Sequence, residues 1–187
     1  MKITLIRHAE VATPFRGKYN GHNDIGLSQK GKEEAKKLAK CFTCKSFDLV
    51  YCSDLRRAKE TLAPFSQAKD AIFTEKLREK SWGKHEGLSF EEICAQGLKY
   101  SDFNQWIETL DGERVGVYTQ RVKQFFFEEL AEKKADNILV ITHAGVIRVL
   151  MAIVQNISLE DAFCVALPYT SYTVYDTDCQ TFSTIKT

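Results

Sequence analysis

The sequence lacks an apolar run long enough to cross a bilayer, and Lys2 is followed by only a short apolar stretch without a signal-peptide cleavage site. Its formal net charge is only +1, so it also lacks the excess of basic residues that is typical of nucleic-acid-binding and membrane-surface proteins. We therefore expect a cytoplasmic protein that has neither nucleic acid nor a membrane as its partner.

Clusters of metal ligands are equally scarce. The chain has four histidines and six cysteines, and its single CxxC pair, Cys41 and Cys44, has neither a second close cysteine pair nor a histidine nearby. This spacing disfavours a zinc or redox site, and in a cytoplasmic protein we expect the cysteines to be reduced thiols. The chain also lacks a GxxxxGK[ST] phosphate loop and a carboxylate cluster for magnesium. We therefore predict no metal and no cofactor.

The composition that remains is that of an ordinary globular protein. Hydrophobic residues make up 44% and charged residues 27% of 187 positions, which is enough for one sizeable core. No internal repeat, linker or low-complexity segment interrupts the sequence, so we predict a single domain over residues 1–187. The lysines between positions 30 and 40 share a helical periodicity with apolar residues, which indicates a solvated helix face rather than a binding patch.

Short apolar runs and helical periodicities alternate along the chain. Strands are predicted at residues 3–6, 48–52, 71–73 and 138–142, and in the tail at 164–167, 171–176 and 182–185. Helices are predicted at residues 28–42, 55–65, 89–93, 101–110 and 117–133 and from 146 onward, with Ser28 and Ser89 as N-caps. This order predicts an α/β fold of βα units on a mainly parallel sheet.

Three of the predicted strands end in residues that can bind or attack a phosphate group. The first ends at Arg7 and His8, the second at Ser53 with Arg57 just inside the next helix, and the fourth at His143. Taken alone, Arg7 and His8 fit an ion pair and a strand cap. If the three strands are parallel neighbours, however, their carboxyl ends form one cationic cleft, to which helix N-termini add positive potential. Such a cleft suits a phosphate, and a neutral imidazole beside it can attack phosphorus.

The segment Arg7-His8-Ala9-Glu10 resembles the RHG signature of the histidine phosphatase superfamily, which is also called the phosphoglycerate-mutase-like family. Each motif alone is only suggestive, but five in the family's order are highly specific. The further matches cover nearly the whole chain: Tyr19, Gly21, Asp24, Leu27, Ser28 and Gly31; residues 53–61 for SxLxRAxxT; Leu77, Glu79, Gly83, Glu86 and Gly87 for the acid-bearing loop; Gly112 and Glu113; and residues 142–145.

This resemblance implies a three-layer αβα sandwich with a mainly parallel central sheet, and a metal-independent reaction through a phosphohistidine. It implies that His8 is the nucleophile and that Glu79 gives a proton to the leaving oxygen. Arg7, Arg57 and His143 would bind the phosphoryl oxygens and stabilise charge during transfer. Arg57, and not the arginine before it, falls on the family's position. Judged without the resemblance, Glu79 fits a surface carboxylate among basic neighbours better than a catalytic acid.

The chain departs from the family's pattern at four positions. Ala9 replaces a glycine, which matters if that position needs a positive φ, and Val11 replaces a common threonine. Pro14 stands where an asparagine often contacts the phosphate, and Arg114 stands where serine is usual. These departures concern substrate affinity and loop detail rather than the core chemistry.

Segments 19–22, 47–50 and 137–140 are most similar to α-ribazole phosphatases, which remove the 5′-phosphate from α-ribazole phosphate in cobalamin nucleotide-loop assembly. The hypothesis is therefore a phosphomonoesterase of that specificity, whose partner is a small-molecule phosphate monoester. Three alternatives stay open: a broad-specificity phosphatase of sugar phosphates, a phosphoglycerate mutase, and a catalytically silent phosphate-binding protein. The mutase is disfavoured because the chain lacks the large insertion of the mutases. The sequence does not specify an oligomeric state.

Overall fold

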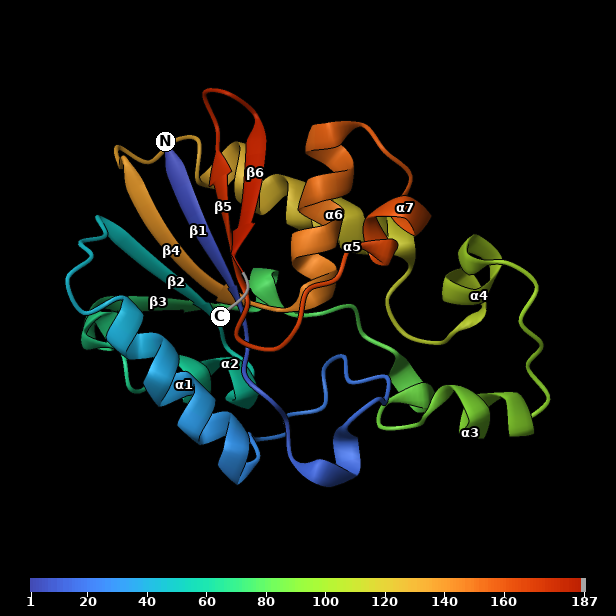
Figure 1. The fold of residues 1–187 in the computed structure, drawn as a ribbon. Helices are drawn as coiled ribbons and strands as arrows, with labels where there is room; N and C mark the ends of the chain where they lie inside the picture. The colour runs from blue at the N-terminus through green and yellow to red at the C-terminus, as the bar shows by residue number, and fades with distance from the viewer. Residues whose placement is uncertain (186–187) are drawn as a thin grey trace.

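Six strands form one central sheet in the computed structural model, which describes residues 1–185 (Figure 1). Their order across the sheet is β3-β2-β4-β1-β5-β6. The first four strands in this order pair in parallel, β5 pairs with β1 in the antiparallel sense, and β6 is antiparallel to β5. The prediction of a mainly parallel sheet is thus confirmed. The strands are β1 (Lys2–Arg7), β2 (Leu49–Ser53), β3 (Ala71–Thr74), β4 (Asn137–Thr142), β5 (Tyr172–Asp176) and β6 (Thr181–Ile185).

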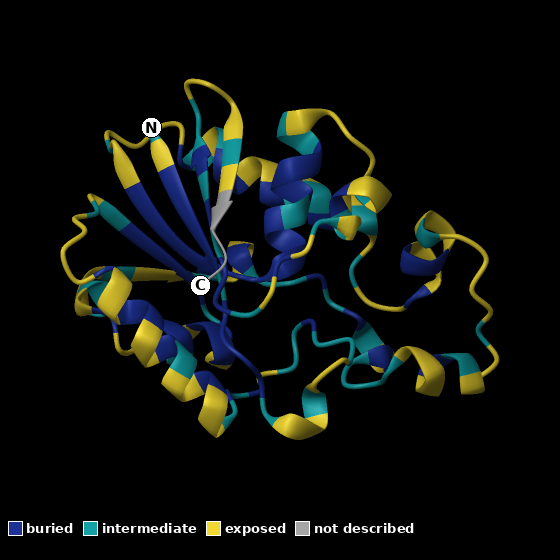
Figure 2. Cartoon of the chain, viewed as in Figure 1, coloured by how far each residue is buried: buried dark blue, intermediate teal, exposed yellow. Residues whose placement is uncertain are grey.

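Helices cover both faces of this sheet, so the predicted three-layer αβα sandwich is confirmed (Figure 1). On one face lie α1 (Gln29–Cys41) and α2 (Arg56–Leu62), and on the other lie α5 (Val115–Lys123) and α6 (Ala144–Gln155). Because both faces are covered, the central strands are buried along most of their length, as Figure 2 shows. This burial explains why they are continuous apolar runs in the sequence.

The side chains of β4 show how the two faces divide the core. Leu139 and Ile141 pack with α1 and α2, whereas Ile138 and Val140 pack with α5 and α6. Successive residues of a strand point to opposite faces of the sheet, so one apolar run supplies both clusters. Because β4 lies in the middle of the sheet, the residue that follows it, His143, is placed between the two helical layers.

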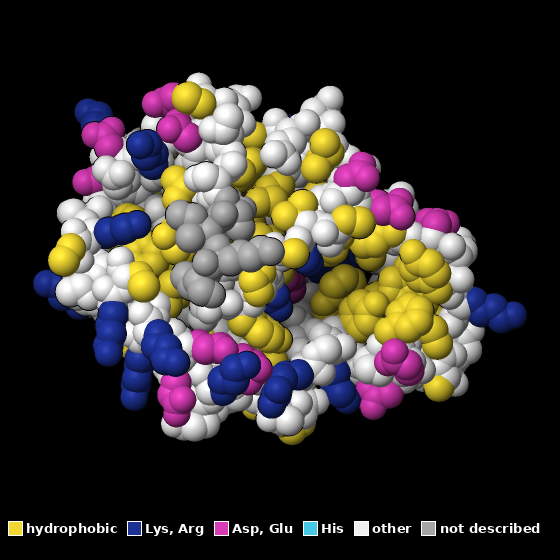
Figure 3. Space-filling view, in the orientation of Figure 1, with side chains coloured by type: hydrophobic (Ala, Val, Ile, Leu, Met, Phe, Trp, Pro, Cys, Tyr) yellow, Lys and Arg dark blue, Asp and Glu magenta, His cyan; other side chains and the backbone are white. Residues whose placement is uncertain are grey.

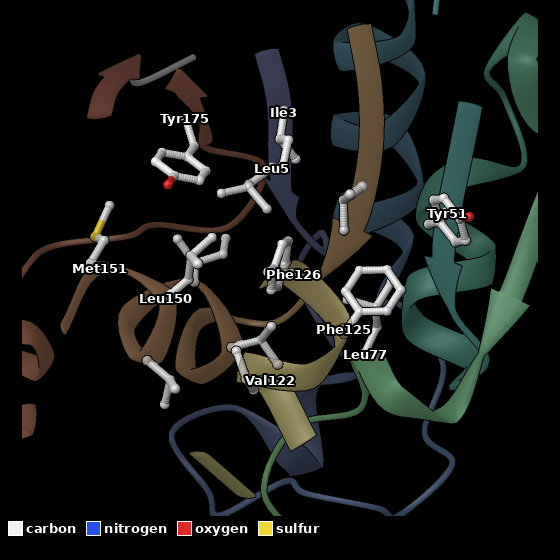
Figure 4. Close-up of a cluster of buried hydrophobic side chains, with 14 of the residues drawn as sticks. Ile3, Leu5, Tyr51, Leu77, Val122, Phe125, Phe126, Leu150, Met151 and Tyr175 are labelled. Atoms are coloured by element: carbon white, nitrogen blue, oxygen red, sulfur yellow. The ribbon is translucent and has the colours of Figure 1, made fainter. Parts of the chain in front are cut away.

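The helix predicted at residues 117–133 begins at Val115 and changes at Gln124 into a π-helical segment, Gln124–Glu129. The N–H of Leu130 donates to the carbonyl of Phe125, five residues back. This wider turn keeps Leu130 on the buried face with Phe125, in the cluster drawn in Figure 4. Packing of bulky apolar residues at this point therefore ends the α-helix earlier than the periodicity predicted.

A smaller lobe beside the sandwich contains α3 (Phe90–Ala95) and α4 (Phe103–Thr109) (Figure 1). It has its own apolar cluster, which includes Trp82 and Trp106. The rings of Phe103 in α4 and Phe163 in α7 meet across the gap between lobe and sandwich, with 5.1 Å between centroids. The remaining helices are α7 (Leu159–Cys164) and four short 3₁₀ segments, Thr13–Phe15, Ser66–Asp70, Glu75–Leu77 and Gly83–His85.

The N-caps at Ser28 and Ser89 are confirmed, and both side chains accept a hydrogen bond from the third residue of their helix. The strand predicted at residues 164–167 is wrong, because Cys164 ends α7. The carbonyls of Val165 and Leu167 accept hydrogen bonds from arginine side chains instead of from a neighbouring strand. Within residues 1–185, the helices are all too short or too polar to cross a membrane.

Candidate active site

The carboxyl ends of β2, β4 and β1 lie next to one another in the sheet, and each delivers a predicted site residue to the same edge. His8 follows β1, Ser53 ends β2, and His143 follows β4. The rings of His8 and His143 are both buried and approach to 5.1 Å between centroids at an angle of 60°. The parallel strand order thus brings together residues that are far apart in the sequence.

The backbone carbonyl of the next residue, Ala9, holds His8 in one tautomer. Its Nδ1 lies 2.8 Å from the carbonyl oxygen of Ala9, and a carbonyl only accepts, so Nδ1 carries the hydrogen and Nε2 the lone pair. Burial, followed by the nearby charges of Arg57 and Arg7, holds the pKa of His8 well below its usual value. At neutral pH the ring is therefore uncharged, with a nucleophilic nitrogen at Nε2.

Arg57 is hydrogen-bonded to His143, whose ring packs against the ring of His8. The Arg57 Nε–H donates to Nδ1 of His143 at 3.2 Å, so the remaining ring hydrogen lies on Nε2 and points to Ser53 Oγ at 2.9 Å. Burial, Arg57 and His8 together lower the pKa of His143 well below its usual value. Burial also lowers the pKa of Arg57 to about 10, which still leaves the guanidinium charged at neutral pH.

The rest of the Arg57 guanidinium holds the loop that precedes α1. Its Nη1 donates to the carbonyl of Asn23, and its Nη2 donates to the carbonyls of Asn20 and Gly21. Counting the bond to His143, the described residues accept four of the five guanidinium hydrogens and leave one, on Nη1. The preceding Arg56 is exposed and pairs with Glu60 at the surface, so only the second arginine of this motif points inward.

The described residues accept only some of the hydrogen bonds that the Arg7 guanidinium can donate. Its Nη1 donates to the carbonyl of Leu167, but its Nε is buried and has no hydrogen-bond partner among the described residues. Burial lowers the pKa of Arg7, and the ion pairs of residues 1–185 do not include it. A buried donor without an acceptor and a positive charge outside the ion pairs of the described residues, both beside His8, are the features that bind an anion such as phosphate.

Glu79 lies across the cavity and is fixed at both oxygens. Its Oε2 accepts from the N–H of Gly145 at the start of α6, at 2.9 Å. Its Oε1 accepts from the hydroxyl of Tyr118 at 2.6 Å and from the N–H of Lys80 at 3.1 Å. The carboxylate therefore points to the N-terminus of α6, where the helix dipole favours negative charge. This arrangement supports a position in the cavity over that of a surface carboxylate.

Gly145 provides the space that Glu79 occupies, and this gives a first prediction. A Cβ at position 145 would lie 2.1 Å from Glu79 Oε1 and 2.8 Å from the Tyr118 hydroxyl, so Gly145→Ala should displace the carboxylate. We expect turnover to fall by about 10²-fold, because a misplacement near 1 Å has effects of that size. Stability should not fall for lack of helix propensity, since alanine is the better helix former.

Gly116→Ala is the matched control, because a Cβ at that position of α5 meets nothing within 4 Å. It should leave turnover unchanged. Equal activity of both variants in a steady-state assay would show that the placement of Glu79 does not matter for turnover.

A cavity of about 210 Å³ opens above these residues. Arg7, His8, Glu79 and Gly145 line one part of it, while Arg57 and His143 lie outside its lining. Figure 3 shows a hollow bordered by hydrophobic side chains that gather over α3 and α4. The cavity therefore combines a polar part with an aromatic part, whose rings are those of Tyr19, Trp82, Tyr118, Phe163 and Tyr169.

The departures from the family's pattern are accommodated in the structure. Ala9 is fully buried, is not among the residues with positive φ, and donates its N–H to Thr61 Oγ1 at 2.9 Å, so an alanine fits there without strain. Val11 lines the cavity, and Pro14 lies in the short Thr13–Phe15 helix. Arg114 is the N-cap residue of α5 but makes no side-chain capping bond.

Some residues of the site escaped the sequence reasoning. Tyr118 lies on the apolar stripe of a helix and resembles a core residue in the sequence. Tyr169 and Arg148 line the cavity from the segments around α6 and β5, without a motif to mark them. Ser53 is marked in the sequence by its strand end and by the SxLxRAxxT match, but its contact with Nε2 of His143 is not. Within residues 1–185, no group of three or more His, Cys, Asp or Glu side chains is placed to hold a metal ion.

Comparison with known proteins defines the class. The sequence model of the histidine phosphatase superfamily (branch 1) matches residues 3–186, and the chain belongs to this superfamily. A phosphohistidine mechanism is general to the family.

Similar individual proteins carry several names. The chain is 28% identical to the adenosylcobalamin/α-ribazole phosphatase of Salmonella typhimurium, over 100% of this chain and 95% of that protein. It is also 28% identical to phosphoserine phosphatase 1 of Hydrogenobacter thermophilus, over 93% of this chain and 85% of that protein. The crystal structure of the α-ribazole phosphatase from Shigella flexneri superposes with a TM-score of 0.84 at 25% identity, covering 99% of this chain and 95% of that one.

Proposed function

We propose that this protein is a phosphomonoesterase that transfers the phosphoryl group of its substrate to Nε2 of His8 and then to water, without a metal ion. One observation carries the proposal: a neutral His8 with its lone pair on Nε2 lies beside Arg7, whose buried Nε has no acceptor among the described residues. This arrangement supports His8 as the nucleophile and Arg7 as a donor to the phosphate.

In the first half of the reaction, Nε2 of His8 attacks phosphorus and the bond from phosphorus to the leaving oxygen breaks. Glu79 carries a proton once the phosphate dianion is bound beside it, and it gives this proton to the leaving oxygen while Arg7 holds the phosphoryl oxygens as charge develops on them. The ring of His8 becomes cationic, and its Nδ1–H bond to the Ala9 carbonyl grows stronger as it does. Arg57 and His143 keep the ring in place from behind, and the free Nη1 hydrogen of Arg57 is the donor it has left for a phosphoryl oxygen.

In the second half, a water molecule attacks phosphorus and gives its proton to the Glu79 carboxylate. The bond between phosphorus and Nε2 breaks, inorganic phosphate leaves, and His8 returns to its neutral form. Glu79 regains in this step the proton that it lost in the first, so the cycle closes without any other acid or base.

For the substrate, we propose α-ribazole 5′-phosphate. The names of the Salmonella and Shigella relatives support this choice. So does the aromatic part of the cavity, because Trp82 and Phe163 line it and aromatic side chains pack well against a planar base. The principal alternative is a small phosphate monoester such as phosphoserine or a sugar phosphate, and the phosphoserine phosphatase relative supports it.

A substrate panel tests both parts of this proposal. The purified protein, kept in EDTA throughout, is assayed with α-ribazole 5′-phosphate, phosphoserine, several sugar phosphates, and 3-phosphoglycerate with and without its bisphosphate. We expect phosphate release in EDTA, with kcat/KM highest for α-ribazole 5′-phosphate by about tenfold or more, since burying a planar base contributes at least ~1.4 kcal/mol of binding.

Each other result has a definite meaning. Activity that appears only after magnesium is added would overturn the metal-free mechanism. A higher kcat/KM for phosphoserine or a sugar phosphate would replace the substrate but keep the chemistry. Conversion of 3-phosphoglycerate to its isomer without phosphate release would identify a mutase.

A further inference from the structure

Tyr169 packs against both residues that begin the proposed reaction. The Arg7 guanidinium carbon lies 4.1 Å from the centroid of the Tyr169 ring. The ring of His8 lies 5.6 Å away between centroids, at an angle of 49°. Tyr169 is half-buried and lines the cavity, so its ring forms a wall of the space that the phosphoryl group would occupy.

A strained turn presents this tyrosine to the site. The turn covers residues 168–171 and is closed by a 3.1 Å backbone hydrogen bond between its ends, and its third residue, Thr170, has a φ of 58°. A β-branched residue is rare in this left-handed region and stays there only where its surroundings hold it. The Arg7 N–H donates to the last carbonyl of the turn at 3.1 Å, and the Thr170 N–H points to the carbonyl of His8 at 3.5 Å. The turn is therefore bonded to the same two residues that Tyr169 contacts.

An aromatic partner suits Arg7 better than a carboxylate would. Burial removes water from this guanidinium, and the ion pairs of residues 1–185 supply no carboxylate in its place. A carboxylate there would compete with the phosphate for the same N–H groups and would repel its charge. The face of a ring attracts the cation through its quadrupole and leaves both the positive charge and the N–H groups at the edge available.

We propose that Tyr169 is a positioning residue whose ring orients the guanidinium of Arg7 beside His8, so that Arg7 meets the phosphoryl group already aligned. This inference rests on the proposed function, because it concerns the same phosphate site. It assigns the effect to the ring of Tyr169 and not to its hydroxyl, since the contacts with Arg7 and His8 are made by the ring. Stacking fixes the plane of a guanidinium, which determines where its N–H groups point.

The test measures the binding of inorganic phosphate by calorimetry, together with KM and kcat. Tyr169→Phe keeps the ring and should bind phosphate within about twofold of the original protein. Tyr169→Leu removes the ring and should weaken phosphate binding and raise KM by roughly 3- to 30-fold, the range of a cation–π contact that is partly removed from water. Thermal unfolding of each variant shows that the protein is folded in the assay.

A double-mutant cycle isolates the path through Arg7. Arg7→Lys keeps the charge but removes the planar group on which the ring stacks, so Tyr169→Leu should cause no further loss of phosphate binding in that background. Equal losses in both backgrounds would show that Tyr169 merely holds the turn, and a loss in Tyr169→Phe as large as in Tyr169→Leu would assign the effect to the hydroxyl. Either result overturns the proposal. Because calorimetry needs no turnover, a protein that binds phosphate but hydrolyses nothing would count against the proposed function and not against the role of Tyr169.

Discussion

His8→Ala should reduce turnover on the order of 10⁴–10⁶-fold and should abolish any covalently bound phosphate. The reason is that Nε2 of this ring is the nucleophile in the proposed reaction, and no other described residue that lines the cavity has an imidazole ring. The measurement is a rapid quench with ³²P-labelled substrate. The original protein should yield an acid-labile, alkali-stable label on His8, as expected for a phosphoramidate, and the variant should yield none.

His22→Ala is the matched control, because the ring of His22 lines a different hollow of the protein. It should retain both the label and the activity. A label that survives acid would indicate a phosphoester on a hydroxyl or a stable adduct, and an active His8→Ala variant would remove this residue from the reaction altogether.

Glu79→Gln should slow the hydrolysis of alkyl phosphates by a general-acid factor on the order of 10²–10⁴, and that of p-nitrophenyl phosphate far less. An alkoxide leaves phosphorus with difficulty unless its oxygen receives a proton as the bond breaks, whereas p-nitrophenolate leaves without much help. The amide should keep the shape of the site. Its oxygen can accept from the Gly145 N–H, and its NH₂ can donate to the Tyr118 hydroxyl, which is able to accept as well as donate, so that only the 3.1 Å bond from the Lys80 N–H is lost.

The measurement is a comparison of single-turnover phosphorylation rates on the two classes of substrate. Glu75→Gln is the matched control, since its carboxylate is 75% exposed on the same stretch of chain. Equal losses on both substrates would contradict the proton-donor role and would point to water activation or to a structural part for Glu79. Loss on neither would place the carboxylate outside the reaction.

Local signals were sufficient for most of the fold. The apolar runs of β1, β2 and β4 and the serine caps of α1 and α3 need only neighbouring residues to be recognised, and the structure has them where they were predicted. The two misjudged segments depend on distant partners. Leu130 is drawn onto the buried face by packing in a cluster that also includes β1 and β4, and the carbonyls at residues 165–167 are taken by Arg7 and Arg148. Neither of these contacts can be read from a short window of sequence.

The same distinction between local signals and distant partners applies to the candidate site. The sequence by itself determined which residues reach the edge of the sheet, because a parallel strand that ends in Arg7 and His8 or in His143 can release them only there. Tertiary structure decided how each of them is bonded. The tautomer of His8 follows from the carbonyl that its Nδ1 meets, and that of His143 follows from Arg57, which comes from another βα unit. Tyr169 reaches Arg7 from a turn more than 160 positions away in the chain, so only the packing of that turn against β1 could bring the two together.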